Sequence, residues 1–475
     1  MTHRASQAIA DPFHSRPMFW LTLAVVFGAF FLADHDLSVS QSDAFTGTAD
    51  EMEQQAAGGN ALRRASFLAI AGLGVLGLLL PAYAERGQRG TTGSGSDDGH
   101  RRAEPFAIHN PRTAIRPGVL ALLIAALAGW CLLSVLWSDM PSMSLRRCIV
   151  AGCLLVGAVG IARQLSLREL VHLAWIIPAV WLAIGVSAEI RLGTFRPWSG
   201  EYRFSGTTHP NTQGLSLATM CFATFCLARE GRWKKRGYLV VCGIGLLFLV
   251  LTKSRTSFAG VLGALTLLLT MRTASGTKWS VGLFAVWSVA TAALFVLLFN
   301  VDVGEQLTHL ALMGRKEQSA SLTGRMPIWT VLADFVSQRP IVGYGYESFW
   351  TPDRIDAVST ELQWGIREAH SAYIDTVLSV GLVGAGLLLL TVFTGLRSAA
   401  QRYLKTGHPS FGFLFAVCVF GLINAFTESG MTMPMFVPFV AVCGFVQLAR
   451  LRPANAGPLF NLEMAHTSLL DGPAR

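Results

Sequence analysis

The sequence predicts an all-α polytopic membrane protein with about 12 transmembrane helices and one large loop on the outer face of the membrane. Hydrophobic residues make up 52% of the 475 residues, charged residues make up 14%, and the mean hydropathy is +0.46. Soluble domains usually carry about 25% charged residues. Apolar runs long enough to cross a hydrocarbon core as helices recur along the whole chain.

Twelve apolar runs are predicted spans, and eleven to thirteen are compatible with the sequence. The run at 148–162 is short and the run at 257–271 is marginal. The predicted spans are 17–33, 65–84, 117–137, 148–162, 171–189, 213–228, 237–252, 257–271, 281–299, 371–396, 410–427 and 431–449.

Lysine and arginine concentrate in alternate loops, which predicts an orientation with both termini in the cytoplasm. The first outer loop, after span 17–33, is instead acidic. Because the basic residues follow the topology, the net charge of +9 does not indicate nucleic acid binding. The predicted inner loops contain Arg86, Arg89, Arg101, Arg102, Arg112, Arg116, Arg229, Arg232, Lys234, Lys235 and Arg236.

The spans divide the chain into regions. The first apolar run has no cleavage site close behind it, so it is interpreted as a retained helix. The cysteines all lie in or next to apolar runs, so neither disulfides nor a cysteine metal site is expected. The predicted regions are an N-terminal two-helix region, 1–116, with a basic cytoplasmic linker, 85–116; a transmembrane core, 117–299; a large periplasmic loop, 300–370; C-terminal transmembrane helices, 371–449; and a cytoplasmic tail, 450–475.

The large outer loop contains a predicted amphipathic helix that starts near Pro327. This helix could lie on the membrane interface with Trp329 at the level of the lipid headgroups. Pro340 ends it, and Gly343 and Gly345 make a turn. The apolar face is formed by Ile328, Trp329, Leu332, Phe335 and Val336.

Three arginines and one histidine, far apart in the chain, lie in or beside predicted outer loops. They are Arg203, Arg255, Arg325 and His370. The planar guanidinium group binds phosphate oxygens through two parallel hydrogen bonds and stays charged at any relevant pH. The four residues therefore predict a site for a membrane-bound diphosphate and a hydroxyl group. Each arginine alone is also compatible with a solvated or snorkelling side chain.

The loop after Arg203 is rich in small polar side chains. Its sequence R-F-S-G-T-T-H-P-N includes His209 and Asn211, and it predicts a shaped polar pocket for substrate. An ordinary surface loop is the alternative interpretation.

His370 stands where the tenth span begins. A neutral imidazole there could take a proton from an attacking sugar hydroxyl. Glu368 or Glu347 could orient the imidazole or compensate its charge. A capping or interfacial histidine is the alternative.

Acidic residues near the membrane offer further candidates. Asp34 and Asp36 flank His35 after the first span, and an Asp-x-Asp pair could hold a divalent metal against a diphosphate. Solvation of the outer loop is the favoured interpretation of this pair. Glu428 lies between the last two spans, and Asp375 in the tenth span is expected to make a hydrogen bond that orients helices.

At these positions the chain resembles the O-antigen ligase/polymerase superfamily of bacterial envelopes. The resemblance runs over about 130–395. Within it, the exopolysaccharide polymerases of the Wzy type, such as those of succinoglycan production, are most similar around residues 201–214. The motifs are L-W-S-D-M-P-S-M-S-L-R-R at 136–147, T-H-P-N at 208–211, L-T-K-S-R-T-S-F-A-G at 251–260, G-R-M-P-I-W from 324, R-P-I-V-G-Y-G-Y-E-S-F up to 349, and H-S-A-Y-I-D-T-V-L-S-V-G-L-V-G at 370–384.

The resemblance implies a GT-C-like helical fold and a metal-independent, inverting glycosyl transfer without a cofactor. It implies that arginines bind the lipid diphosphate, which on this chain are Arg255, Arg325 and Arg203, and that His370 serves catalysis. His209, Asn211, Glu347 and Trp329 complete the predicted substrate-binding set.

The sequence therefore predicts a polymerase of the bacterial cytoplasmic membrane. Its donor and acceptor would be glycans linked to undecaprenyl diphosphate. Other expected partners are the lipid bilayer, a chain-length regulator and a flippase, and no nucleic acid.

Three alternatives stay open. An O-antigen ligase would use the same donor with a lipid A-core acceptor, and a protein O-glycosyltransferase would use it with a protein. A transporter or flippase of lipid-linked sugars would line a path with the arginines. Paired inverted halves and matching broken spans, which are typical of many transporters, are not apparent in the sequence.

Overall fold

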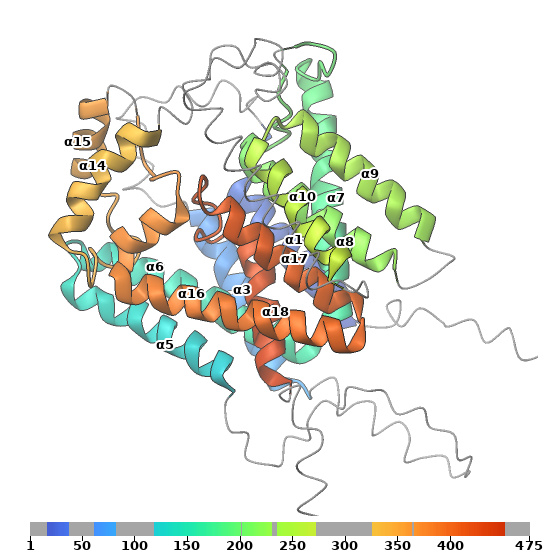
Figure 1. Ribbon diagram of the computed structural model, residues 1–475, viewed down its shortest axis with the longest axis horizontal. Helices are drawn as coiled ribbons and strands as arrows, with labels where there is room; N and C mark the ends of the chain where they lie inside the picture. Colours follow the sequence, from blue (N-terminus) through green and yellow to red (C-terminus); the bar gives the residue numbers. More distant parts are fainter. Residues whose placement is uncertain are drawn as a thin grey trace, which may run out of the picture.

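The computed structural model describes residues 17–37, 61–81, 118–200, 202–229, 235–271, 325–362 and 365–451 (Figure 1). Every predicted span that falls within these residues is a helix, which confirms the predicted all-α membrane fold. Six of the described helices are long and apolar enough to cross a membrane, and three more are shorter apolar helices. The predicted span 281–299, the first part of the large loop and the linker 85–116 lie outside the described residues.

The helix bounds extend several of the predicted spans. The short run at 148–162 belongs to a 24-residue helix that begins at Pro141. The elements in chain order are α1 (Pro17–Asp34), α3 (Ala61–Leu79), α5 (Val119–Leu133), η2 (Ser134–Trp137), α6 (Pro141–Gln164), α7 (Leu167–Leu192), α8 (Pro210–Leu227), α9 (Lys235–Leu251), α10 (Arg255–Thr270), α14 (Arg325–Gln338), α15 (Pro352–Leu362), α16 (Ala372–Thr406), α17 (Pro409–Asn424) and α18 (Phe436–Arg450).

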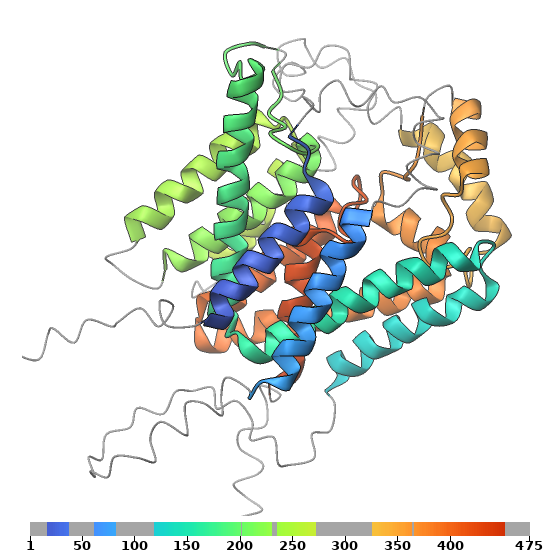
Figure 2. The same ribbon diagram turned by 180° about the vertical axis from the view of Figure 1, so that it is seen from behind.

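Helices α8 and α17 form the centre of the bundle. Nearly all their residues are buried, on every face, as expected for helices that other helices surround. Around them, α3 packs closely along α6, with α1 beside α3 (Figure 2). The close approach of α3 and α6 needs glycine, because a Cβ on Gly160 would lie 2.1 Å from the Gly74 carbonyl oxygen.

The loops predicted to lie outside the membrane meet at one end of the bundle. Asp36 N donates to Thr207 O at 2.8 Å, and Phe204 N donates to Leu251 O at 2.9 Å. Gln164, just after the predicted span 148–162, contacts the second half of the predicted span 65–84, since its Nε2 donates to Gly77 O at 2.7 Å. The alternating topology predicted from the charges therefore agrees with the contacts between loops.

Helix α14 begins two residues before the predicted start and ends before Arg339, as predicted. Its apolar face packs inside the protein, where Ile328 and Leu332 are fully buried in a small core with Tyr344 and Phe349. Helix α15 lies beside it (Figure 1). This packing corrects the expectation that the apolar face of α14 lies on the membrane interface. The apolar residues instead form a core with the outer loop, α15 and α16.

Helix α16 is interrupted at Gly381, a break that the apolar pattern of the sequence does not predict. Gly381 has φ 67° and ψ −175°, and the segment 340–345 runs past the break. Tyr344 N donates to Leu378 O at 2.8 Å, and Leu382 N donates to Pro340 O at 2.8 Å. The segment thus pairs the backbone groups that the break would leave unpaired, as a span in lipid requires.

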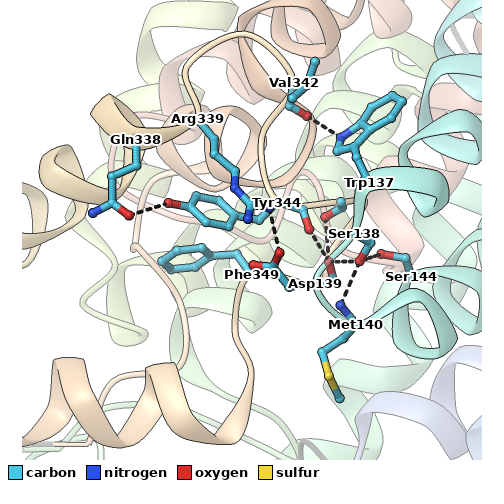
Figure 3. A network of polar contacts seen from close by, with 12 residues as sticks. Trp137, Ser138, Asp139, Met140, Ser144, Gln338, Arg339, Val342, Tyr344 and Phe349 are labelled. Carbon is cyan, nitrogen blue, oxygen red and sulfur yellow. Dashed lines mark hydrogen bonds and ion pairs between the residues drawn. The ribbon is translucent and has the colours of Figure 1, made fainter.

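The motif around residues 136–147 anchors this segment (Figure 3). Trp137 Nε1 donates to Val342 O at 3.0 Å. The Asp139 carboxylate pairs with Arg339 at 2.7 Å and also with Arg354, and the two guanidinium groups lie 4.8 and 4.4 Å from the centre of the Tyr344 ring. Two motifs that are separate in the sequence therefore form one joint between the bundle and the outer loop.

Asp139→Asn is expected to weaken the contact between the bundle and the outer loop modestly. Burial acts to raise the pKa of Asp139, but the hydrogen bonds and charges of Arg354 and Arg339 lower it overall. The stabilisation is therefore present above the ordinary pKa of an aspartate and is lost as pH falls through the lowered value. Since the pair is partly exposed, we expect a loss of about 1 kcal/mol in the free energy of unfolding.

Thermal unfolding of the purified protein in detergent measures this loss. The exposed Asp353→Asn on α15 is the matched control. Equal midpoints for Asp139→Asn and the control near neutral pH would contradict the proposed contribution of the pair.

Candidate active site

The candidate site lies where the outer loops meet, and the loop 203–208 forms one wall of it. Glu189, near the end of α7, is buried and shapes this loop by accepting from Gly206 N at 2.7 Å and Ser205 N at 3.0 Å. Arg203 Nε then donates to Thr252 O at 2.8 Å, at the end of α9. Nothing in the sequence pointed to Glu189.

Asn211, in the first turn of α8, joins two charged side chains. Its Oδ1 accepts from an Arg203 NH2 group at 2.5 Å, and its Nδ2 donates to Glu428 Oε1 at 2.7 Å. The same Glu428 oxygen accepts from Arg325 at 3.0 Å. Residues 203, 211, 325 and 428 therefore form one continuous chain of hydrogen bonds.

Arg255 is the first residue of α10 and is partly buried. The positive charge of Arg325 acts on the Arg255 guanidinium group. Within the described residues, no carboxylate pairs with Arg255. Two neighbouring guanidinium groups, of which one has no anionic partner among the described residues, favour binding of an anion.

His370 has an unusual backbone and a charged partner. Its φ is 50°, a conformation that costs a non-glycine residue energy and that clusters at functional sites. Its Nδ1 lies 3.0 Å from Glu368 Oε1. Burial acts to lower the pKa of His370, but the hydrogen bond and charge of Glu368 raise it overall.

His209 lies near the same group and stays neutral. It caps the start of α8, where its Nδ1 accepts from Asn211 N at 3.3 Å. Burial and the charge of Arg203 lower its pKa to about 3. The charges of Glu368 and His370 also act on it. An imidazole with so low a pKa is a weak base at neutral pH, so His209 suits substrate binding better than proton transfer.

Trp329 and Glu347 have partners outside the series of hydrogen bonds that joins residues 203, 211, 325 and 428. Trp329 Nε1 donates to Ala369 O at 2.9 Å, so it supports the backbone next to His370. Glu347 pairs with Arg147 of α6 at 3.4 Å. Burial raises the pKa of Glu347, against the opposing charge of Arg147. In the contacts of the described residues, Glu368 and not Glu347 is the partner of His370.

The acidic residues after α1 also have partners. Asp34 pairs with Arg63 at 3.4 Å, and His35 Nδ1 lies 2.6 Å from Thr207 Oγ1. Burial lowers the pKa of His35 to about 4. Within the part of the chain that the structure describes, no three His, Cys, Asp or Glu side chains are grouped to hold a metal ion.

Asp375 organises the start of α16, as expected. Its carboxylate accepts from Trp350 Nε1 at 2.9 Å, from Ala369 N at 3.1 Å and from Ser429 Oγ. These contacts hold the outer loop and the turn after α17 close to His370.

The fold and this site define a class: a polytopic membrane protein with arginines and a histidine gathered at one end of its bundle. Residues 240–389 match the family model described as O-antigen ligase. The exopolysaccharide production protein ExoQ of Rhizobium meliloti is 26% identical over 337 residues, which cover 66% of this chain and 74% of that protein. The chain is therefore similar to the O-antigen ligase/polymerase superfamily over this region.

The family match covers part of the site. Arg255, Arg325 and His370 lie inside residues 240–389, and Arg203, Asn211 and Glu428 lie outside them. The site is therefore assembled from the matched region and from helices on either side of it.

Proposed function

We propose that this protein polymerises oligosaccharide repeat units linked to undecaprenyl diphosphate into exopolysaccharide at the periplasmic face of the cytoplasmic membrane. The observation that carries the proposal is the pair Arg255 and Arg325, next to the His370–Glu368 pair. This arrangement suits a departing diphosphate beside a hydroxyl group that must lose a proton. The similarity to ExoQ favours exopolysaccharide as the product.

The proposed step is a direct displacement at the anomeric carbon of the donor. The acceptor hydroxyl oxygen forms the new bond to this carbon while the bond to the diphosphate oxygen breaks, which inverts the configuration. His370 takes the hydroxyl proton, and undecaprenyl diphosphate leaves with the bonding electron pair. Because Nδ1 of His370 contacts Glu368, we assign the proton transfer to Nε2.

The arginines stabilise the charge that develops on the leaving group, without a metal ion. Arg255 and Arg325 contact the diphosphate, and Arg203 adds positive charge from the other wall. His209 and Asn211 belong to the substrate-binding set, together with Trp329 and Glu347. Both termini lie in the cytoplasm, and the expected protein partners are a flippase and a chain-length regulator.

A deletion strain complemented with Arg255→Ala or Arg325→Ala tests this proposal. Removing one preorganised donor to a developing anion costs roughly 100- to 1,000-fold in rate. We therefore expect single lipid-linked repeat units to accumulate on the outer face in place of polymer. The exposed Arg196→Ala in the outer loop before residue 203 is the matched control. Membrane levels of every variant are measured.

The outcome also separates the alternatives. Normal polymer from both variants at normal membrane levels would contradict the site. Full-length polymer that is not attached to lipid A-core would identify an O-antigen ligase, and loss of glycan from protein would identify a protein O-glycosyltransferase. Repeat units retained on the inner face would identify a transporter.

A further inference from the structure

Glu428 lies in the connection between α17 and α18, outside the matched family region. Its side chain is only 9% exposed. One carboxylate oxygen, Oε1, accepts from Asn211 Nδ2 at 2.7 Å and from Arg325 at 3.0 Å. A single oxygen therefore joins the starts of α8 and α14.

The backbone around Glu428 fixes the place of this carboxylate. Glu428 N donates to Asn424 O at 3.0 Å, and Glu428 O accepts from Ala372 N at 3.3 Å. The next residue, Ser429, donates to Asp375. Because Ala372 and Asp375 belong to the start of α16, the carboxylate is held relative to the segment that carries His370.

The contacts of Asn211 fix which group donates and which accepts along this series of hydrogen bonds. Its carbonyl oxygen must face Arg203 and its NH2 group must face Glu428, because a guanidinium only donates and a carboxylate only accepts. The order is cation, amide, anion, cation. Each member orients the next, so Glu428 also acts on Arg203 through Asn211.

Arg325 is held by one edge. A guanidinium has five N–H donors, and the recorded hydrogen bond of Arg325 uses one terminal nitrogen. Within the described residues, no other hydrogen bond of Arg325 is recorded. A fixed guanidinium with unused donors is prepared to bind phosphate oxygens without first losing conformational entropy.

We propose that Glu428 is a positioning residue, which holds Arg325 by one edge and orients Asn211 and Arg203, so that the Arg325 guanidinium presents its other edge to the lipid diphosphate. This inference rests on the proposed function. The opposite role is that Glu428 competes with the diphosphate for Arg325. The two roles predict effects of opposite sign on binding.

Glu428→Ala in the full-length protein, purified in nanodiscs, distinguishes them. The probe is undecaprenyl diphosphate, and its Kd is measured together with kcat/KM for a lipid-linked repeat unit. Positioning predicts weaker probe binding and a loss of about 10- to 100-fold in kcat/KM, the range for a charged hydrogen bond. Tighter probe binding, or unchanged constants, would overturn the proposal. Exposed Glu361→Gln on α15 is the control.

Exchanging the amide and the carboxylate between positions 211 and 428 gives a second test, which does not depend on truncating a side chain to alanine. Asn211→Asp places a second carboxylate against Glu428, and we expect a loss of at least about 10-fold in kcat/KM. Adding Glu428→Gln exchanges the positions of the amide and the carboxylate. The carboxylate at position 211 then accepts from Arg203 and from the amide NH2 group at position 428, and the oxygen of that amide accepts from Arg325. We expect the double variant to recover most of the activity. A double variant no better than Asn211→Asp would contradict positioning.

Failure of this inference differs from failure of the proposed function. If Arg255→Ala and Arg325→Ala make normal polymer, the site on which the proposed function rests is wrong. If these variants lose polymer while Glu428→Ala and Asn211→Asp match the wild type, only the positioning role is wrong.

Discussion

His370→Ala is expected to lower the rate of glycosyl transfer by roughly 100- to 10,000-fold, the usual contribution of a general base. The physical reason is that neither the other histidine nor the arginines of the cluster suit the task. His209 has a pKa near 3 and is a weak base, while the arginines keep their protons. The measurement is single-turnover transfer with a purified lipid-linked repeat unit, which separates chemistry from product release.

The pH dependence of this rate gives a second readout for His370. As a base it must be neutral, so the rate rises with pH through its raised pKa. Glu368 is its hydrogen-bond partner, while the charges of Arg325, which lowers the pKa, and Glu428, which raises it, also face the imidazole. Arg367 and His209 act on Glu368. We expect Glu368→Gln to move the acidic limb to lower pH, because the anion that stabilises the imidazolium is removed.

Two results would contradict this role. A wild-type rate in His370→Ala, at a normal membrane level, would exclude His370 as the base. An acidic limb that stays in place in Glu368→Gln would show that another group sets it. His172→Ala is the matched control, since that histidine contacts Tyr238 between α7 and α9, away from the outer loops.

The structure brings together the cations that the sequence singled out, and the reason that they could be singled out is their cost. An arginine such as Arg255 at the end of an apolar span is expensive unless it has a polar partner or function, so it stands out in a hydrophobic chain. Arg203, Arg325 and His370 were found through the loops that carry them. The topology then placed these loops on one side, and the contacts between loops agree.

The sequence named Glu368 as a partner of His370, but it could not predict how Glu428 and Glu189 organise the site. Glu428 was noticed as a candidate, but its partners Asn211 and Arg325 lie 217 and 103 positions away in the chain. No periodic pattern links such residues. Glu189 was missed because its partners are backbone N–H groups, which have no signature in the sequence. Likewise, an amphipathic pattern gives the apolar face of α14 but not what covers it.

Gly381→Ala is expected to destabilise the protein severely, by about 2–6 kcal/mol. The backbone angles of Gly381 lie in a region that is essentially limited to glycine, which costs about 1–3 kcal/mol for another residue. A Cβ there would also lie 2.1 Å from the Ile341 carbonyl oxygen, and overpacking of this kind costs about 1–3 kcal/mol more. Neither backbone can shift easily, because the segment 340–345 pairs with both sides of the break.

The effect of Gly381→Ala extends to the candidate active site through the outer loop. The segment that pairs with the break continues from α14, which begins at Arg325, and the first half of α16 follows His370 directly. A displaced segment would therefore move both residues. We expect Gly381→Ala to lower the membrane level and the thermal midpoint, and the surviving protein to make little polymer.

Gly386→Ala in the same helix is the matched control. A Cβ at Gly386 meets nothing within 4 Å, and alanine favours a helix over glycine by about 1 kcal/mol. This variant is expected to keep or raise the thermal midpoint. If Gly381→Ala behaves like Gly386→Ala, α16 is not broken at Gly381 in the membrane, and the motif 339–349 must serve another purpose.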